Sequence, residues 1–321
     1  MSTLLLNRSQ VEALLDADTL VERLRAGFVA YSSNPIGRAL RARSPLAGGT
    51  GTATVLFPGS VPGLPVYTVK VHAKFPAEVP AIRGVLCLHD MSSGQLLAIM
   101  DSTYLTAMRT GIAGALAADV LARPDADTVA VIGGGVQGSF QLRALARMRR
   151  IRRVSVYDTA PDRATAFAGQ MARELSLPID VADSVSDAVR DAGVVLAATW
   201  ATTPFILPGM LGPGTHVTTL GPDEPGKAEV SADVIRTSVF VCDDRQLAID
   251  LGALRGVGLG PEAIAAELGD VLAGSHPGRM SPEQTTVYGG VGLAFQDAIA
   301  AWQVYEKAIA GGAGQRFDYL A

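Results

Sequence analysis

One stretch of ten residues carries the clearest structural signal in this chain: Val129-Ala-Val-Ile-Gly-Gly-Gly-Val-Gln-Gly138. Its apolar start predicts a buried strand, and the spacing Gly-x-Gly-x-x-Gly then leads into a predicted helix. In such a turn Gly133 permits the tight bend, Gly135 lets the backbone approach a pyrophosphate, and Gly138 lets helix and strand pack closely. The pyrophosphate lies against N–H groups at the helix N-terminus. The stretch therefore predicts dinucleotide binding, and the alternative is a glycine turn with a structural role alone.

Asp158 occupies the position at which dinucleotide-binding domains distinguish NAD from NADP. Asp158 stands twenty residues beyond Gly138, at the end of the next predicted strand. A carboxylate at this position binds both ribose hydroxyls and repels a 2′-phosphate, which favours NAD over NADP. Arg163 leaves NADP as the less favoured alternative, because a nearby guanidinium can neutralise a phosphate.

Strands and helices alternate on both sides of this turn. The expected strands are 128–132, 154–157, a short one around 179, 194–197, 216–220 and 239–242, and the expected helices are 136–148, 161–175 and 185–190. Repeated strand–helix units of this length predict an α/β fold with a parallel, doubly wound sheet of the Rossmann type.

The segment before residue 122 has a different order of predicted elements. Two helical patterns are followed by β-rich runs at 52–57, 66–73, 84–89 and 95–100, separated by Pro/Gly turns. This order predicts an α+β domain with a largely antiparallel sheet. We expect the last helix, 292–310, to return and pack on it. The predicted domains are therefore residues 1–121 with 293–321, and residues 122–292 for the NAD-binding Rossmann domain.

Composition excludes several classes of protein. The 321 residues carry 27 basic and 31 acidic side chains, a net charge of −4, so we expect no nucleic-acid partner and no membrane partner. The basic run at 143–153 is best interpreted as a solvated helix end, with a nucleic-acid patch as the alternative. Cys87 and Cys242 build neither a disulfide framework nor a metal cluster, so no metal site is expected. With no secretory signal pattern, we expect a soluble, cytoplasmic protein.

Three charged residues lie where chemistry is plausible. Lys70 interrupts an apolar strand, Arg109 opens a helix rich in small residues, and Asp223 follows the strand 216–220. Each also has a purely structural interpretation. Lys70 could be a solvated edge-strand lysine, Arg109 part of a surface ion pair, and Asp223 a turn former. Read functionally, the ammonium polarises a substrate group, the guanidinium clamps a carboxylate, and Asp223 faces the crevice beyond the strand ends. His72 shares a strand face with Lys70 and could border the same site.

At these segments the chain resembles the ornithine cyclodeaminase/mu-crystallin family. The resemblance rests on Lys70, Leu97-Ala-Ile-Met-Asp101, Arg109-Thr-Gly-Ile-Ala-Gly114, Gly133-x-Gly-Val-Gln137 and Gly221-x-Asp223-x-Pro-Gly-Lys227-x-Glu229, and it covers nearly the whole chain in the expected order. It implies a substrate domain built from the N-terminal segment and the C-terminal helix, and a homodimer formed through that domain.

The resemblance also implies residue roles. Lys70 is similar to the family's active-site lysine, which also contacts the substrate, Arg109 to its carboxylate-binding arginine, and Asp223 to its acid/base aspartate. A second carboxylate-binding arginine is expected just before Pro45, where Arg43 fits best and Arg41 is the alternative. The cofactor-binding residues are then expected to be Gly133, Gly135, Val136, Gln137, Gly138, Asp158 and Thr110.

The expected activity is hydride transfer by an NAD-dependent oxidoreductase at the α carbon of a small L-amino acid or a (cyclic) imine. Two alternatives stay open: an ornithine cyclodeaminase, which forms L-proline and ammonia with catalytic NAD, and a non-catalytic NAD(P)H- or ligand-binding protein of the mu-crystallin kind. Ornithine-specific relatives tend to carry a glutamate where Val55 stands here, which disfavours the first alternative. The intact set of Lys70, Arg109 and Asp223 disfavours the second.

Overall fold

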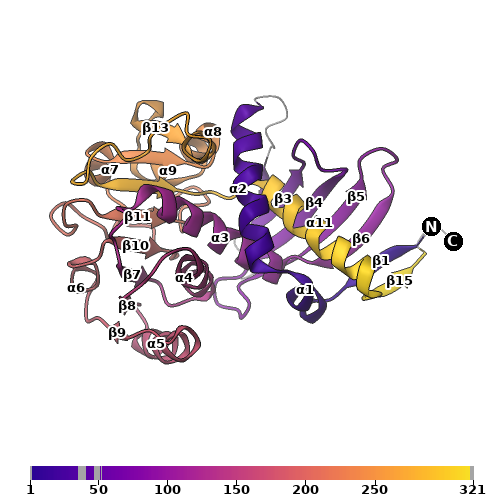
Figure 1. The fold of residues 1–321 in the computed structure, drawn as a ribbon, viewed down its shortest axis with the longest axis horizontal. Helices are drawn as coiled ribbons and strands as arrows, with labels where there is room; N and C mark the ends of the chain where they lie inside the picture. Colours follow the sequence, from indigo (N-terminus) through magenta and orange to yellow (C-terminus); the bar gives the residue numbers. More distant parts are fainter. Residues whose placement is uncertain (1, 35–40, 47–50, 52, 319–321) are drawn as a thin grey trace. The chain divides into compact units, whose positions relative to one another are not determined.

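The computed structural model describes residues 2–34, 41–46, 51 and 53–318. The chain divides into two compact units, Met1–Arg109 with Leu293–Ala321 (unit 1) and Thr110–Gly292 (unit 2). Each unit contains its own sheet, and the division falls inside helix α3, Thr103–Leu121 (Figure 1). The sheets confirm the predicted fold class, a Rossmann-type unit joined to an α+β unit.

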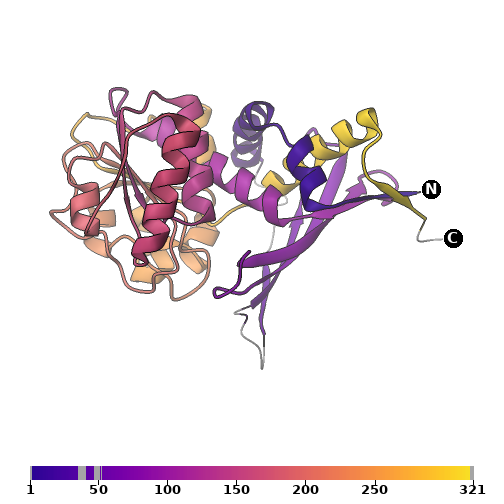
Figure 2. The ribbon, with the colours of Figure 1, turned by 90° about the horizontal axis from the view of Figure 1, so that it is seen from below.

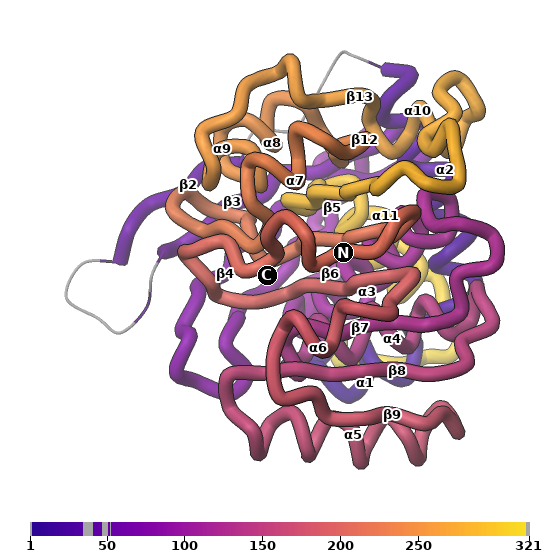
Figure 3. Tube along the Cα trace, turned by 90° about the vertical axis from the view of Figure 1, so that its left-hand side faces the viewer, coloured from indigo at the N-terminus to yellow at the C-terminus, as the bar shows by residue number. Residues whose placement is uncertain are grey.

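Unit 2 is built on an eight-stranded sheet in the order β13-β12-β14-β11-β10-β7-β8-β9, in which neighbouring strands run parallel. Figure 3 shows β7, β8 and β9 in that order toward one edge and β12 and β13 toward the other. The strands are β7 Thr128–Ile132, β8 Arg153–Tyr157, β9 Ile179–Val181, β10 Val194–Ala197, β11 His216–Thr219, β12 Val239–Cys242, β13 Ile264–Glu267 and β14 Thr286–Gly289.

Helices flank this sheet. They are α4 Val136–Met148, α5 Pro161–Leu175, α6 Val185–Val189, α7 Ala232–Arg236, α8 Arg245–Asp250, α9 Ala253–Val257 and α10 Leu268–Leu272, with a 3-10 turn at Pro261–Ala263. Because both faces of the central strands are covered, β10 and β11 are buried along their whole length.

Unit 1 contains a seven-stranded sheet in the order β15-β1-β6-β5-β4-β3-β2. Strands β2 to β6 pair antiparallel, while β1 runs parallel to β6, so the prediction of a largely antiparallel sheet is confirmed. The strands are β1 Thr3–Leu6, β2 Ala42–Pro45, β3 Ala53–Gly59, β4 Val66–Lys74, β5 Ile82–Asp90, β6 Leu96–Asp101 and β15 Gln315–Phe317.

Helices cover one face of this sheet. Helix α11, Ala294–Gly311, packs on β3, β4 and β5, and α2, Ala17–Ser33, packs on α11, while the shorter α1, Arg8–Leu14, contacts α11 and β6. In Figure 2 the indigo and yellow helices lie on one side of the purple strands. A Cβ at Gly59, on β3, would collide with the carbonyl of Ala294, so this glycine lets the first turn of α11 reach the sheet.

Side chains of β4 alternate strictly between the two faces. Thr68, Lys70 and His72 are buried on the helix-covered inner face, whereas Val69 and Val71 lie on the outer face. Strand β4 lies between β3 and β5, so the interpretation of Lys70 as a solvated edge-strand lysine is wrong.

The basic run at 143–153, which begins inside α4, forms ion pairs and hydrogen bonds at the surface of unit 2. Arg143 pairs with Glu174, and Arg153 with Asp180. Arg149 donates to backbone carbonyls at the end of α3. These contacts support the solvated-helix interpretation over a nucleic-acid patch. Among the described residues, no helix is long and apolar enough to cross a bilayer.

Candidate active-site residues

The glycine turn of unit 2 has the geometry that its sequence predicts. Strand β7 ends at Ile132, and Gly133 follows with a φ of +104°, a conformation that L side chains rarely adopt. A Cβ at Gly138 would collide with the carbonyl of Gly133, so helix and turn approach closely there. A Cβ at Gly135 would meet nothing within 4 Å, which leaves room for a ligand beside the N-terminus of α4.

Asp158 lies beside this turn at the end of β8. One carboxylate oxygen accepts from the N–H of Gly134 at 2.9 Å, and the other accepts from the N–H of Ala160 at 2.9 Å. Arg163 Nε lies 3.2 Å from that second oxygen. The structure thus places Asp158, the predicted ribose-binding carboxylate, at the glycine turn and pairs it with Arg163.

The remaining predicted cofactor residues surround the start of α4. Val136 is exposed, and the side-chain oxygen of Gln137 is buried without a hydrogen-bond partner among the described residues. Thr110 lies on α3. The next residue, Gly111, lets α3 approach α4 closely, because a Cβ at this position would collide with the backbone of Phe140. Within the described part of the chain, the oxygen of Gln137 is therefore an unused hydrogen-bond acceptor beside the glycine turn.

The loop after β11 is held by a buried carboxylate. Glu229 accepts from the N–H and hydroxyl of Thr199, at 2.6 and 2.7 Å, from the hydroxyl of Thr219 at 2.6 Å and from the N–H of Gly221 at 3.1 Å. Burial raises the pKa of Glu229 against these hydrogen bonds. The four bonds fix the beginning of the loop that carries Asp223.

Asp223 itself is partly exposed on this loop. Lys227 Nζ lies 2.9 Å from its carboxylate and 3.1 Å from that of Glu224, and it also lies 4.0 Å from the ring centre of Trp200. Lys227, which belongs to the same loop, therefore orients the carboxylate of Asp223. The glycine turn, Asp158 and Asp223 follow β7, β8 and β11, so they share the carboxyl edge of the parallel sheet.

In unit 1 a buried ionic network joins β4, α3 and α11. Lys70 Nζ lies 2.7 Å from one carboxylate oxygen of Asp297, and Arg109 Nε lies 3.0 Å from the other. Arg109 also donates to the side-chain oxygen of Gln296 at 2.8 Å, and Lys70 lies 3.3 Å from the hydroxyl of Thr106. Lys70 and Asp297 are completely buried, and the network holds two cations against one carboxylate.

Burial and charge tune these groups in opposite directions. Burial lowers the pKa of Lys70 to about 7, although the neighbouring charge of Asp297 raises it. Burial also opposes ionisation of Asp297, but the charges of Arg109 and Lys70 overcome this and hold its pKa below the ordinary value. Asp297 is therefore a carboxylate, while Lys70 can gain or lose a proton near neutral pH.

An aromatic ring lies next to this network. The ring centre of Phe57, on β3, lies 4.7 Å from Lys70 Nζ and 4.5 Å from the guanidinium carbon of Arg41. The imidazole of His72 stacks on the same ring at 5.6 Å. Arg43 lies on β2 opposite Val55 and is exposed. The structure thus brings Arg41 to the neighbourhood of Lys70, and the choice of Arg43 or Arg41 as carboxylate ligand stays a prediction.

Sequence reasoning did not identify Asp297, Gln296 or Thr106 as part of the site. A signal for Asp297 exists, because it is a single charge among the apolar residues of Ala294-Phe-Gln-Asp-Ala-Ile-Ala-Ala301. A carboxylate on a helix face that is otherwise apolar needs a buried cation. Among the described residues, no group of three His, Cys, Asp or Glu side chains is arranged to hold a metal ion.

Comparisons with known proteins agree with this geometry. A model of the ornithine cyclodeaminase/mu-crystallin family matches residues 1–312. An alanine dehydrogenase of Archaeoglobus fulgidus is 31% identical over 340 residues, covering 100% of this chain and 99% of that protein.

Two solved structures have the same fold. An archaeal alanine dehydrogenase dimer with bound NAD has a TM-score of 0.91 and 29% identity, with all of both chains covered. The Thermococcus litoralis Δ1-pyrroline-2-carboxylate reductase in complex with NADH and L-proline has a TM-score of 0.91 and 30% identity, covering 98% of this chain and 99% of that one.

Proposed function

Because the chain belongs to the ornithine cyclodeaminase/mu-crystallin family, we propose that it is an NAD-dependent oxidoreductase that transfers hydride at the α carbon of a small L-amino acid or a (cyclic) imine. The observation that carries this proposal is the buried network of Lys70, Arg109 and Asp297. Two cations around one carboxylate leave positive charge, and a buried surplus of this kind matches a substrate carboxylate.

The residues of unit 2 fit NAD. The open side of the turn at Gly135 leaves space for the pyrophosphate, and Asp158 presents a carboxylate for the ribose hydroxyls. The buried, unpartnered oxygen of Gln137 is available to a donor of the cofactor. When bound, NAD accepts or donates the hydride. The relatives solved with NAD or NADH support this assignment.

In unit 1 we assign different roles to the cations. Asp297 and Gln296 fix the guanidinium of Arg109 through hydrogen bonds. We propose that this guanidinium binds the substrate carboxylate, with Arg41 or Arg43 as the second arginine. Lys70 holds its proton at Nζ against Asp297, and we assign to this ammonium the polarisation of the imine or carbonyl group of the substrate. Asp297 positions both cations.

Asp223 is the proposed acid/base group. Lys227 holds its carboxylate at 2.9 Å, and its partial exposure lets it exchange protons with a substrate amine or with water. Glu229 fixes the loop and so restricts where this carboxylate can point.

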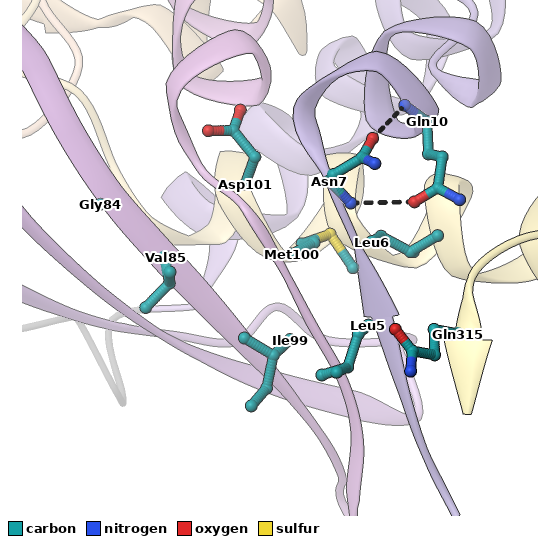
Figure 4. A pocket seen from close by; sticks show the side chains of 10 residues that line it. All are labelled: Leu5, Leu6, Asn7, Gln10, Gly84, Val85, Ile99, Met100, Asp101 and Gln315. Carbon is teal, nitrogen blue, oxygen red and sulfur yellow. Dashed lines mark hydrogen bonds between the residues drawn. The ribbon is translucent and has the colours of Figure 1, made fainter. Parts of the chain in front are cut away.

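We also propose that a second copy of the chain covers the outer face of the unit 1 sheet. Leu56, Val71 and Val85 are neighbours across β3, β4 and β5 and are exposed. Beside them a groove of about 460 Å³ runs between β5, β6 and β1, with Leu5, Val85 and Ile99 in its wall (Figure 4). A contiguous apolar face is typical of a subunit interface, and an archaeal relative is described as a dimer.

The test is a substrate screen with the purified protein. L-amino acids are offered with NAD or NADP, and cyclic imines with NADH or NADPH, while NADH absorbance and ammonia are followed together. We expect a net absorbance change with NAD or NADH. Lys70→Met and Arg109→Met should each lower kcat/KM by about a hundredfold or more, while NADH binding persists.

Other outcomes identify the alternatives. Ammonia release without net absorbance change indicates a cyclodeaminase, a function disfavoured by the buried, apolar Val55. NADH binding without turnover of any substrate indicates a ligand-binding protein. Wild-type rates in both the Lys70 and the Arg109 variant would contradict the proposed roles.

A further inference from the structure

One buried polar side chain of unit 1 has no task in the reaction described so far. The side chain of His72 is 4% exposed, yet neither ring nitrogen has a hydrogen-bond partner among the residues that the structure describes. Leaving a buried N–H unpaired is unfavourable, because the group loses its hydrogen bond to water, so an imidazole of this kind calls for an explanation.

Its position explains why none of the described side chains satisfies it. On the neighbouring strands His72 lies opposite Val55 and Gly84, and neither offers a polar side chain. The third neighbour is the ring of Phe57, on which the imidazole stacks. Lys70, two residues earlier on the same face, lies against that same ring, so His72 borders the proposed substrate-binding residues.

The charges around the imidazole are mainly positive. The ionic groups that act on it are Lys70, Arg41, Lys74 and Asp297. Burial, followed by the three cations, lowers the pKa of His72 to about 2, and Asp297 alone opposes them. The carboxylate of Asp297 already takes Lys70 and Arg109. His72 is therefore a neutral imidazole, with one N–H donor, in a positive surrounding.

A donor in a positive surrounding favours an anionic partner. A side-chain amine, as in ornithine, would meet repulsion from Lys70 and Arg41, while an apolar side chain would leave the N–H unpaired. In the proposed function the α-carboxylate is bound by Arg109 and a second arginine. We therefore assign a different group of the substrate to His72.

We propose that His72 is the donor of a second anion subsite that binds a side-chain carboxylate, which makes the substrate a dicarboxylic L-amino acid or the corresponding imine. This inference rests on the proposed function and adds its substrate class. The imidazole N–H donates to this side-chain carboxylate in the field of Arg41 and Lys74, which leaves Arg43 as the second arginine for the α-carboxylate.

Turnover tests this with substrates that differ in one group. Glutamate is compared with glutamine and with ornithine, and aspartate with asparagine, each with NAD. The wild-type protein should favour a dicarboxylate over its amide by about tenfold or more in kcat/KM. His72→Phe should remove that preference through KM and leave the amides within about twofold, and His72→Asn, which keeps a donor, should retain part of it.

A matched control and a binding assay complete the design. His89→Phe replaces another imidazole of the same sheet, one that stacks on Tyr67, and should leave the preference unchanged. Calorimetry with the NADH-loaded protein compares glutarate with pentanoate, and the wild-type protein should bind glutarate about tenfold tighter or more. His72→Phe should bring the two affinities close together.

The outcomes separate this inference from the proposed function. If no amino acid or imine is turned over, the proposed function fails, and the glutarate measurement still decides whether the subsite exists. A wild-type preference for alanine, glutamine or ornithine overturns the dicarboxylate assignment. So does an equal loss with every substrate in His72→Phe, because that result assigns His72 to the positioning of Lys70.

Discussion

Replacing Asp297 by asparagine should break the buried network of unit 1 while almost preserving its shape. The carboxylate lies 2.7 Å from Lys70 and 3.0 Å from Arg109, and the Lys70 and Asp297 side chains are completely buried. Removing one partner of a buried ion pair costs roughly 3–5 kcal/mol, because a charge remains without compensation. Arg109 keeps its bond to Gln296, so we expect the lower end, about 3 kcal/mol, at pH 6.

The loss should depend on pH with a definite sign. Burial already lowers the pKa of Lys70 to about 7 in the folded protein, and without the charge of Asp297 it falls further. Below pH 7, protonation of Lys70 in the variant therefore costs more than in the wild type. Above pH 7 the lysine is mostly neutral in both, so this part of the difference disappears. We expect about 1–2 kcal/mol less destabilisation at pH 9 than at pH 6.

A double-mutant cycle isolates the interaction. Asp297→Asn, Lys70→Met and the double variant are unfolded in urea at both pH values, in a Trp200→Phe background so that Trp302 on α11 reports on unit 1. The coupling energy should be about 1.5–3 kcal/mol at pH 6 and smaller at pH 9. Additivity within about 0.5 kcal/mol at both pH values would refute the reasoning.

Three further variants test other parts of the molecule. Asp158→Ser should lower kcat/KM with NADH about tenfold and raise the relative use of NADPH, measured by comparing both cofactors with one substrate. Val71→Glu should convert the proposed dimer into monomers in light scattering after size exclusion, whereas Val181→Glu, at an exposed valine of unit 2, should not. In Glu229→Gln one side-chain oxygen is replaced by an NH₂ group, which faces the donors of Thr199 or Thr219. We therefore expect the free energy of unfolding to fall by about 2–3 kcal/mol, and turnover to be reduced.

The Rossmann unit was largely predictable because its signals are local. The turn at Gly133 and the carboxylate at Asp158 are each defined by neighbours within a few dozen residues. Strands β13 and β14 were not predicted from the sequence. Strand β14 is four residues long and runs into glycines, yet it lies between β11 and β12 in the sheet. A short strand bordered by glycines resembles a hinge until its neighbours are known.

The ionic network of unit 1 depends on contacts that no local pattern contains. Lys70 and Asp297 are 227 positions apart, and only the strand order makes β4 an interior strand. An apolar strand with one lysine is typical of an edge strand as well as of a buried ion pair. The family resemblance indicated Lys70 and Arg109. The lone charge of Asp297 in an apolar helix indicates a buried partner, but only the packing of α11 on the sheet identifies that partner as Lys70 and Arg109.

The alternation of β4 links the proposed interface to the proposed site. Val69 and Val71 point to the outer face, and Lys70 and His72 point to the inner one, so a second copy packed on the outer face would hold the strand that positions both inner side chains. Separating the subunits should therefore loosen Lys70 and His72 without touching them. The monomer produced by Val71→Glu should lose turnover through kcat, yet keep NADH binding at the glycine turn of unit 2. A fully active monomer would show that the inner face needs no support from the outer one.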